Sequence, residues 1–279
     1  MSDLAIITGG AGGMGLACAK ILGRDHQLII CDISQEKLTQ AANELKSLGI
    51  QCATRVCDIT DQQAVQQLFH DAAKMTEQKG AGEGTLRCVV HTAGISPQMA
   101  DPLTILRVNT LGTIHITEAA LALAGPGFAL VNVASMAGHL LPNIMIPTRA
   151  FRLAFTNQTK FIHKLLFPCQ LMPKPLYRNG LAYAISKTFV IWYCKRMAGK
   201  FGDRNARILS VSPGSFDTQM GRLEEKSGSA DMLENAALKR FGKVEEIAEL
   251  LAFCASDKAS YLTGTDILCD GGVVAARIK

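Results

Sequence analysis

Thr8-Gly9-Gly10-Ala11-Gly12-Gly13-Met14-Gly15 follows directly on the apolar residues 4–7 and precedes a helix-like run over residues 16–22. The first turn of a helix presents free backbone N–H groups and the positive end of its dipole, so it attracts phosphate. Glycine lets the backbone turn tightly and lets a pyrophosphate approach without a Cβ in the way. A flexible loop or an ordinary tight turn is the competing interpretation. The features that follow along the chain favour the phosphate site.

Composition narrows the class of protein. The chain has 279 residues, of which 48% are hydrophobic and 19% charged, so it can bury a large core. Its net charge of +5 is spread without a dense Lys/Arg run, so no nucleic-acid partner is implied. A signal-like N-terminus is absent, and no apolar run reaches the roughly 18 residues of a membrane span. We expect a cytoplasmic protein with no membrane span.

The nine cysteines are odd in number and lie mostly within apolar runs, without a Cys-x-x-Cys pair or the Cys/His spacing of a zinc site. We expect reduced core residues, because burial makes most thiols unreactive. Five histidines likewise lack metal-ligand companions, so we expect no metal and a surface or hydrogen-bonded core position for each: His26, His70, His115, His139 and His163.

Strand-like and helix-like segments alternate from end to end. The strand-like segments are solid apolar runs, which is typical of a parallel sheet buried on both faces. The helix-like stretches carry apolar residues at helical spacing, and neither a repeat nor a second domain is apparent. We predict a single-domain α/β fold over residues 1–279, a doubly wound parallel sheet of the Rossmann type, with strands near 4–7, 27–31, 51–57, 86–90, 128–133, 207–211 and 266–269.

Two carboxylates follow the second and third predicted strands. Asp32 stands about 25 residues after the first strand, where an acidic residue accepts hydrogen bonds from an adenosine ribose. A carboxylate there repels a 2′-phosphate and no arginine follows it directly, which favours NAD over NADP. Capping of the next helix is the alternative for Asp32. Asp58, followed by Ile59, either holds the adenine amino group or caps the helix that begins near Thr60.

Further polar or glycine-containing turns also stand at strand ends. In an open α/β sheet, ligands bind at the carboxyl ends of the strands. The Thr92-Ala93-Gly94 turn, Ser135 and Pro213-Gly214 should therefore meet the two aspartates around one crevice. Tyr183 and Lys187 are four positions apart in a predicted helix, so they share one of its faces.

In this order, the motifs resemble the short-chain dehydrogenase/reductase family over nearly the whole chain. The resemblance implies NAD(P)-dependent oxidation of an alcohol or reduction of a ketone, in a homodimer or homotetramer. It rests on Thr8-Gly9-x-x-x-Gly13-x-Gly15, Ala93-Gly94, Ser135, Tyr183-x-x-x-Lys187, Pro213-Gly214 and Tyr261-Leu262-Thr263-Gly264-Thr265 with Asp270-Gly271-Gly272.

The resemblance also implies roles for single residues. Tyr183 would be the general acid/base; a free phenol has a pKa of roughly 10, and the ammonium of Lys187 would lower that value toward the working pH. Lys187 would also bind the nicotinamide ribose. Ser135 would donate a hydrogen bond to the substrate oxygen. Asn109 would position a water for proton relay to the lysine, unless it is merely a polar residue tolerated in a helix.

The same resemblance gives the predicted cofactor contacts. Thr218, in competition with Ser215, would bind the nicotinamide carboxamide. The full predicted set is Gly9, Gly13, Met14, Gly15, Asp32, Asp58, Ile59, Ala93, Gly94, Tyr183, Lys187, Pro213, Gly214 and Thr218.

The chain departs from the family pattern in two places. His91 replaces the first asparagine of the turn that the family usually writes Asn-Asn-Ala-Gly; we expect it to brace the sheet by other hydrogen bonds rather than to act in catalysis. The second departure is an insert at residues 136–180, which leaves 48 positions between Ser135 and Tyr183. An insertion in this place resembles that of bacterial 3-alpha-hydroxysteroid dehydrogenase/carbonyl reductase, where it serves subunit association.

A helix-like stretch at 148–167 within the insert has two faces. We expect it to cover an apolar substrate pocket as a lid or to form an oligomer contact, with attachment to a membrane surface as a third use. The apolar face comprises Phe151, Ala154, Phe155, Ile162, Leu165 and Leu166, and the basic face Arg149, Arg152, Lys160, His163 and Lys164.

The sequence thus predicts an NAD-dependent oxidoreductase that interconverts a secondary alcohol and a ketone, with a steroid-like or other apolar molecule as candidate substrate. Residues 215–240 are expected to form a mobile substrate loop. Two rival functions share the same residues: an epimerase or dehydratase with a retained cofactor, and a non-catalytic dinucleotide-binding sensor.

Overall fold

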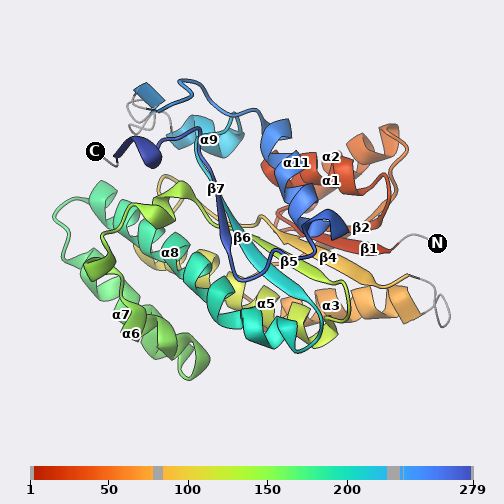
Figure 1. The fold of residues 1–279 in the computed structure, drawn as a ribbon, viewed down its shortest axis with the longest axis horizontal. Helices are drawn as coiled ribbons and strands as arrows, with labels where there is room; N and C mark the ends of the chain where they lie inside the picture. The colour runs from red at the N-terminus through yellow and green to blue at the C-terminus, as the bar shows by residue number, and fades with distance from the viewer. Residues whose placement is uncertain (1–2, 78–83, 225–232, 235, 278–279) are drawn as a thin grey trace.

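A computed structural model describes residues 3–77, 84–224, 233–234 and 236–277. Seven parallel strands form one sheet in the order β3-β2-β1-β4-β5-β6-β7 (Figure 1). The chain winds outward from β1 in both directions, so the topological switch lies between β1 and β4, where this class of sheet binds ligands. The strands are β1 (Leu4–Thr8), β2 (Gln27–Asp32), β3 (Cys52–Val56), β4 (Leu86–His91), β5 (Ala129–Val133), β6 (Arg207–Pro213) and β7 (Asp266–Cys269).

Helices cover both faces of the sheet, as the solid apolar strands predict (Figure 1). Successive strand residues point to opposite faces, so Ile6 packs on one side and Ile7 on the other, both fully buried. One face is covered by α1 (Gly13–Leu22), α2 (Gln35–Ser47) and α11 (Val244–Ala255). The other is covered by α3 (Gln62–Glu77), α5 (Gly112–Leu123) and α8 (Pro175–Gly202). The predicted doubly wound fold is confirmed.

The helical stretch that contains Asn109 is not a uniform α-helix. It begins as α4 (Pro102–Leu106), where Asp101 Oδ1 accepts hydrogen bonds from the N–H groups of Leu103 and Thr104. It continues as the π-helical turn η1 (Arg107–Leu111) before α5. A π-turn interrupts the regular bonding ladder, and such turns are frequent at functional sites. Asn109 lies in its middle.

The insert folds as separate pieces rather than as one helix over 148–167. The predicted helix-like stretch is divided into α6 (Thr148–Phe151), the 3₁₀ turn η4 (Arg152–Phe155) and α7 (Gln158–Gln170). The break has a local cause, because Asn157 Oδ1 accepts the Lys160 N–H at 2.8 Å and so starts α7 as its N-cap. Helix α8 begins at Pro175, so the last residues of the 136–180 segment belong to the helix that carries Tyr183.

The apolar face of the insert is covered by the chain itself. The Phe161 and Phe151 rings lie 4.9 and 5.3 Å from the Phe189 ring of α8, and both are fully buried. Helices α6 and α7 thus lie outside α8, on its side away from the sheet (Figure 1). The predicted apolar face is present and packs into the core of the chain itself, while the use of the insert as a lid or an oligomer contact stays a prediction. Two members of the predicted face are less covered: Phe155 is 40% exposed and Leu166 is partly buried.

The structure also bears on three further predictions, which concern the cysteines, membrane spans and the substrate loop. All nine cysteines are free; seven are buried, and Cys52 and Cys269 are half-buried. None of the helices in the described residues is long and apolar enough to cross a membrane. The predicted substrate loop at 215–240 contains α9 (Gln219–Glu224), whereas residues 225–232 and 235 of that prediction lie outside the described residues.

Candidate active site

Three glycines of the turn between β1 and α1 have no room for a side chain: Gly9, Gly10 and Gly15. Gly9 and Gly13 adopt left-handed φ values of +65° and +51°, which glycine tolerates at low cost. A Cβ on Gly9 would lie 2.8 Å from the backbone nitrogen of Ala93, and one on Gly15 would strike the Gly9 carbonyl. Gly12 is the N-cap of α1 and supplies no side-chain hydrogen bond. The turn therefore leaves the start of α1 shaped for an anion.

The two predicted adenosine contacts lie at neighbouring strand ends. The Cys57 N–H donates to the Asp32 carbonyl at 2.9 Å, which brings the ends of β2 and β3 together. Asp32 Oδ1 accepts the Ser34 N–H at 3.2 Å, while Asp58 Oδ1 accepts both the N–H and the hydroxyl of Thr60 at 2.8 Å. The alternative role of Asp58 as a helix cap is wrong, because Asp61 Oδ1 accepts the N–H groups of residues 63 and 64 at the start of α3.

The Ile59 side chain lies in the hydrophobic core next to this sheet edge. Its side chain is 6% exposed and packs where a Cβ on Gly112 would come within 2.5 Å of Ile59 Cδ1. Its carbonyl accepts a hydrogen bond from His115 Nδ1 at 3.0 Å. His115 is thus a hydrogen-bonded core histidine, as expected for it.

The Ala93-Gly94 turn lies against the glycine turn and the catalytic helix. Thr92 Oγ1 donates to the Thr8 carbonyl at 2.7 Å, which ties this turn to β1. A Cβ on Gly94 would lie 3.1 Å from Asn109 Oδ1 and 3.4 Å from Lys187 Nζ. A side chain here would therefore crowd the Asn109 amide, while Lys187 Nζ would stand at ordinary contact distance.

His91 braces the sheet from within, as predicted. Its Nδ1 lies 2.6 Å from Thr8 Oγ1 and its Nε2 lies 3.4 Å from Thr113 Oγ1. Because Thr113 Oγ1 donates its own proton to the Asn109 carbonyl at 2.8 Å, it accepts from His91 Nε2–H, and Thr8 donates to the bare Nδ1. Burial, with a smaller contribution from the positive charge of Lys187, lowers the pKa of His91 to about 3. The imidazole is therefore neutral near pH 7.

Asn109 connects two parts of the site. Its Oδ1 accepts the Ile95 N–H at 2.9 Å, and its Nδ2 donates to the Ile95 carbonyl at 3.0 Å and to Ser186 Oγ at 3.1 Å. Ser186 Oγ in turn donates to the Tyr183 carbonyl at 2.7 Å. Asn109 is 2% exposed and fully hydrogen-bonded, so it has a structural role, while its proton-relay role stays a prediction. It joins the chain after Gly94 to the turn of α8 that carries Tyr183 and Lys187.

Tyr183 and Lys187 lie one helical turn apart in α8, as their spacing predicts. The Lys187 side chain is buried, at 6% exposure, and its ammonium donates to the Val133 carbonyl at 3.0 Å. The same ammonium lies 5.8 Å from the centroid of the Tyr183 ring. The positive charge is therefore held at the carboxyl end of β5, close to the phenol.

Ser135 follows β5 and is packed against the same helix. Its Oγ accepts the Ala137 N–H at 3.2 Å and so caps the 3₁₀ turn η2 (Met136–His139). The Thr188 hydroxyl, next to Lys187, shares its proton between the Ala184 carbonyl of its own helix at 2.8 Å and the Gly138 carbonyl of the turn at 3.0 Å. Because Ser135 Oγ accepts the backbone hydrogen bond from Ala137, its hydroxyl proton remains available for a different acceptor. The catalytic set predicted from the sequence thus gathers around the end of β5.

The Pro213-Gly214 turn brings Thr218 across the crevice. Gly214 packs so closely that a Cβ would lie 2.6 Å from Asp270 Cα. Thr218 Cγ2 lies 3.8 Å from the place where a Cβ on Gly13 would stand, while its Oγ1 accepts the Gly221 N–H at 2.9 Å. Of the two competing residues, Thr218 is the one placed beside the glycine turn; Ser215 is buried at 9% exposure.

Two family patterns match the chain at the positions of these residues. The pattern described as short chain dehydrogenase matches residues 3–148, and the one described as enoyl-(acyl carrier protein) reductase matches residues 174–274. The chain belongs to the short-chain dehydrogenase/reductase family. It is therefore an oxidoreductase, and its fold is one that binds a nicotinamide dinucleotide cofactor. Residues 149–173, which hold most of the insert helices, lie between the two matched ranges.

Relatives of known sequence span the whole chain of this dehydrogenase/reductase. A short-chain dehydrogenase/reductase (bsc3) of Alternaria brassicicola is 30% identical, over 99% of this chain and 97% of that protein. A 3-oxoacyl-[acyl-carrier-protein] reductase (FabG) of Thermotoga maritima is 26% identical, over 97% of both. Among solved structures, a short-chain dehydrogenase from Burkholderia cenocepacia in complex with NADP has a TM-score of 0.75 at 24% identity, over 97% of each chain. That likeness shows the shared fold.

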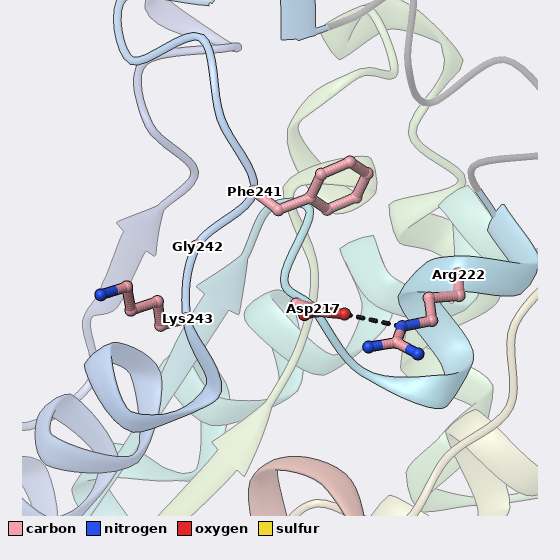
Figure 2. A pocket seen from close by; sticks show the side chains of 5 residues that line it. All are labelled: Asp217, Arg222, Phe241, Gly242 and Lys243. Carbon is pink, nitrogen blue, oxygen red and sulfur yellow. Dashed lines mark hydrogen bonds and ion pairs between the residues drawn. The ribbon is translucent and has the colours of Figure 1, made fainter.

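One further hollow lies beside the family site. It measures about 330 Å³ and is lined by Asp217 and Arg222, from the predicted 215–240 loop, and by Phe241, Gly242 and Lys243 (Figure 2). Arg222 Nε donates to Asp217 Oδ1 at 2.8 Å across it (Figure 2). The Asp217 N–H also donates to the Gly242 carbonyl at 2.9 Å. The hollow is thus next to the segment that carries Thr218, since Asp217 directly precedes that residue.

Sequence reasoning missed several residues that hold the site. Thr8, Thr113 and Ser186 supply the hydrogen bonds that connect the glycine turn, the π-turn and α8. Ser186 had one available signal, since it directly precedes Lys187 in the helix. Thr8 also had a signal, as the first residue of the glycine motif, whereas Thr113 had none, although it donates to the carbonyl of the nearby Asn109.

Proposed function

We propose that this enzyme is an NAD-dependent oxidoreductase that interconverts a secondary alcohol and a ketone. The observation that carries the proposal is the buried ammonium of Lys187, held by the Val133 carbonyl 5.8 Å from the Tyr183 ring. A fixed positive charge beside a phenol favours the phenolate, which is the form that accepts a proton. Such a pair suits an enzyme that moves a proton at neutral pH.

Tyr183 is the proton donor and acceptor in this proposal. In ketone reduction its hydroxyl gives a proton to the carbonyl oxygen; in alcohol oxidation its phenolate takes the hydroxyl proton. A nicotinamide dinucleotide, when bound, supplies or accepts the hydride. Lys187 stabilises the phenolate left after each reduction, and its hydrogen bond to Val133 fixes where that stabilisation acts.

Ser135 orients the substrate oxygen. Its Oγ accepts a backbone N–H within η2, so the hydroxyl proton is directed to another acceptor. A hydrogen bond from this hydroxyl to the substrate oxygen would hold that oxygen beside Tyr183. Asn109 contributes from behind, since its amide joins Ile95 to Ser186 and so fixes the α8 turn that carries Tyr183.

The dinucleotide fits the residues that are present. The start of α1 without a side-chain cap and the crowded Gly9 and Gly15 would hold the pyrophosphate. Asp32 would hold the adenosine ribose, with Asp58 at the adenine, Lys187 at the nicotinamide ribose and Thr218 at the carboxamide. Asp32 is the support for NAD over NADP, because its carboxylate repels a 2′-phosphate.

The surroundings of Ser135 favour an apolar substrate. Ile144 and Met145, a few residues beyond the η2 turn, are 95% and 55% exposed. Apolar side chains exposed on the segment that follows the η2 turn support the proposal of a ketone or alcohol with an apolar body, of which a steroid is one example. We propose a homodimer or homotetramer as the assembly.

A screen of turnover tests the proposal. Purified enzyme is given NADH or NADPH with cyclohexanone, ethyl acetoacetate and a 3-ketosteroid, and NAD⁺ with the matching alcohols, while absorbance at the reduced nicotinamide band is followed. We expect stoichiometric oxidation of NADH by at least one ketone. Product formation without net change in free NADH would instead indicate an epimerase or dehydratase. Binding of NADH without turnover of any member would indicate a sensor.

A further inference from the structure

Asp266 is a buried carboxylate on the edge strand of the sheet. It is the first residue of β7, and its side chain is only 4% exposed. Its Oδ1 accepts hydrogen bonds from Ser210 Oγ at 2.5 Å and from Ser212 Oγ at 3.0 Å, both on β6. Burial of a carboxylate is costly unless hydrogen bonds compensate it. The remaining oxygen, Oδ2, has its partner on a different element.

That partner is His139, the last residue of the turn that Ser135 caps. His139 Nε2 lies 2.8 Å from Asp266 Oδ2 and 3.3 Å from Ser212 Oγ. Because an ionised carboxylate only accepts, Nε2 must carry the proton and donate it, in the neutral ring and in the cation alike. The bond joins η2 to β7, two strands away from β5 in the sheet.

In the described residues, two side-chain ties from opposite sides hold the η2 turn. From α8, Thr188 Oγ1 donates to the Gly138 carbonyl, one residue after Lys187. From the sheet, Asp266 and Ser212 hold the His139 ring. The Ser135 hydroxyl, at the head of the turn, is therefore fixed relative to both the catalytic helix and the sheet edge.

We propose that His139 is a positioning residue for Ser135, acting through its hydrogen bond to Asp266. The inference rests on the proposed function of Ser135 as the group that orients the substrate oxygen. The hydrogen-bond partners of the His139 ring are Asp266 on β7 and Ser212 on β6, away from the glycine turn in the sheet order, so we expect its effect on the substrate side. A hydrogen-bond donor at this place, rather than an aromatic ring, is what the turn requires.

The test compares His139→Phe, which keeps a ring but loses the donor, with His139→Gln, whose amide nitrogen can replace Nε2–H. His163→Phe, at an exposed position of α7, is the matched control. With the ketone of highest turnover, we expect kcat to fall about tenfold in His139→Phe and to recover to within about threefold in His139→Gln, with the NADH Kd unchanged. His163→Phe should behave like the wild type. An unchanged kcat in His139→Phe would overturn the proposal.

A double-mutant cycle separates positioning from general loosening. If His139 acts through Ser135, then His139→Phe should cost almost nothing further in a Ser135→Ala background. An equal tenfold loss in both backgrounds would show that His139 acts by another route and would refute the inference.

Hydrogen exchange supplies a readout that does not depend on turnover. Amides in a peptide spanning residues 134–141 should exchange about tenfold faster in His139→Phe than in the wild type or His139→Gln, while peptides from the start of α1 stay unchanged. Unchanged exchange in 134–141 would contradict the positioning role. If exchange responds but no ketone or alcohol is turned over by the wild type, the proposed function fails while the tie itself stands.

Discussion

Lys187 donates a hydrogen bond from its buried ammonium to the carbonyl of Val133, at 3.0 Å. The bond fixes the charge at the carboxyl end of β5, where the chain continues into Ser135. Without that carbonyl, a flexible lysine side chain would lose conformational entropy each time it was held in place. The end of β5 therefore positions Lys187 and Ser135, and the hydrogen bonds of Asn109 and Ser186 hold the turn of α8 that carries Tyr183.

Asp32 is predicted to decide which cofactor binds. In Asp32→Ala, the Kd for NADH should rise about tenfold, because hydrogen bonds to a charged group are lost. The Kd for NADPH should stay constant or fall, since the repulsion of the 2′-phosphate disappears. Fluorescence titration with each reduced cofactor measures both values. Asp25→Ala, an exposed carboxylate before β2, serves as the control. An unchanged ratio of the two Kd values in Asp32→Ala would refute the ribose role.

His91 is predicted to make the fold sensitive to acid. Its pKa is about 3 in the folded protein, against 6.5 for an unperturbed histidine, so between these values the unfolded chain binds more protons. Its contribution to stability is present above pH 6.5 and is lost as the pH falls toward 3. Between pH 7.5 and 5.0 this loss amounts to about 2 kcal/mol.

Urea unfolding of the wild type and His91→Asn at the two pH values isolates this contribution. The free energy of unfolding of the wild type should fall by about 2 kcal/mol more than that of the variant. His163→Asn, at an exposed histidine, should follow the wild type. Equal pH dependence in the wild type and His91→Asn would show that His91 is not held neutral by the fold.

The insert is predicted to be part of the folded core. Phe161→Ala removes a fully buried ring that contacts Phe189, so the free energy of unfolding should fall by about 3–5 kcal/mol. Phe167→Ala, on the same helix but 63% exposed, should change it by less than about 1 kcal/mol. Thermal or urea unfolding followed by circular dichroism compares the two. Similar small effects for both would mean that α7 does not pack on α8 as described.

The sequence pattern was sufficient to predict the sheet, because the strand preference of these segments agrees with their burial between two layers of helices. Most strands have a strongly apolar centre, as in β1 and β2, and the order of the motifs placed their polar or glycine-containing ends at one edge of the sheet. The aromatic packing of the insert was harder to predict. Its pattern indicated that Phe151, Ile162 and Leu165 would be buried, but periodicity does not say which surface buries them.

The remaining differences have local or long-range causes. The break before α7 depends on one capping hydrogen bond from Asn157, a type of residue that also occurs in loops. The bond between His139 and Asp266 joins positions that are 127 residues apart, so no spacing in the sequence marks it. A histidine expected to be an isolated surface or core residue is thus part of the support of the proposed active site.

The most direct test of the account is Tyr183→Phe, which removes one hydroxyl and leaves the ring beside Lys187. With the best ketone from the screen, kcat should fall by at least about 10³-fold, because the proton donor is gone, while the Kd for NADH stays within about twofold. Stopped-flow oxidation of NADH and fluorescence titration measure the two quantities on the same sample. Turnover near the wild-type rate in Tyr183→Phe, with NADH still bound, would contradict the proposed mechanism.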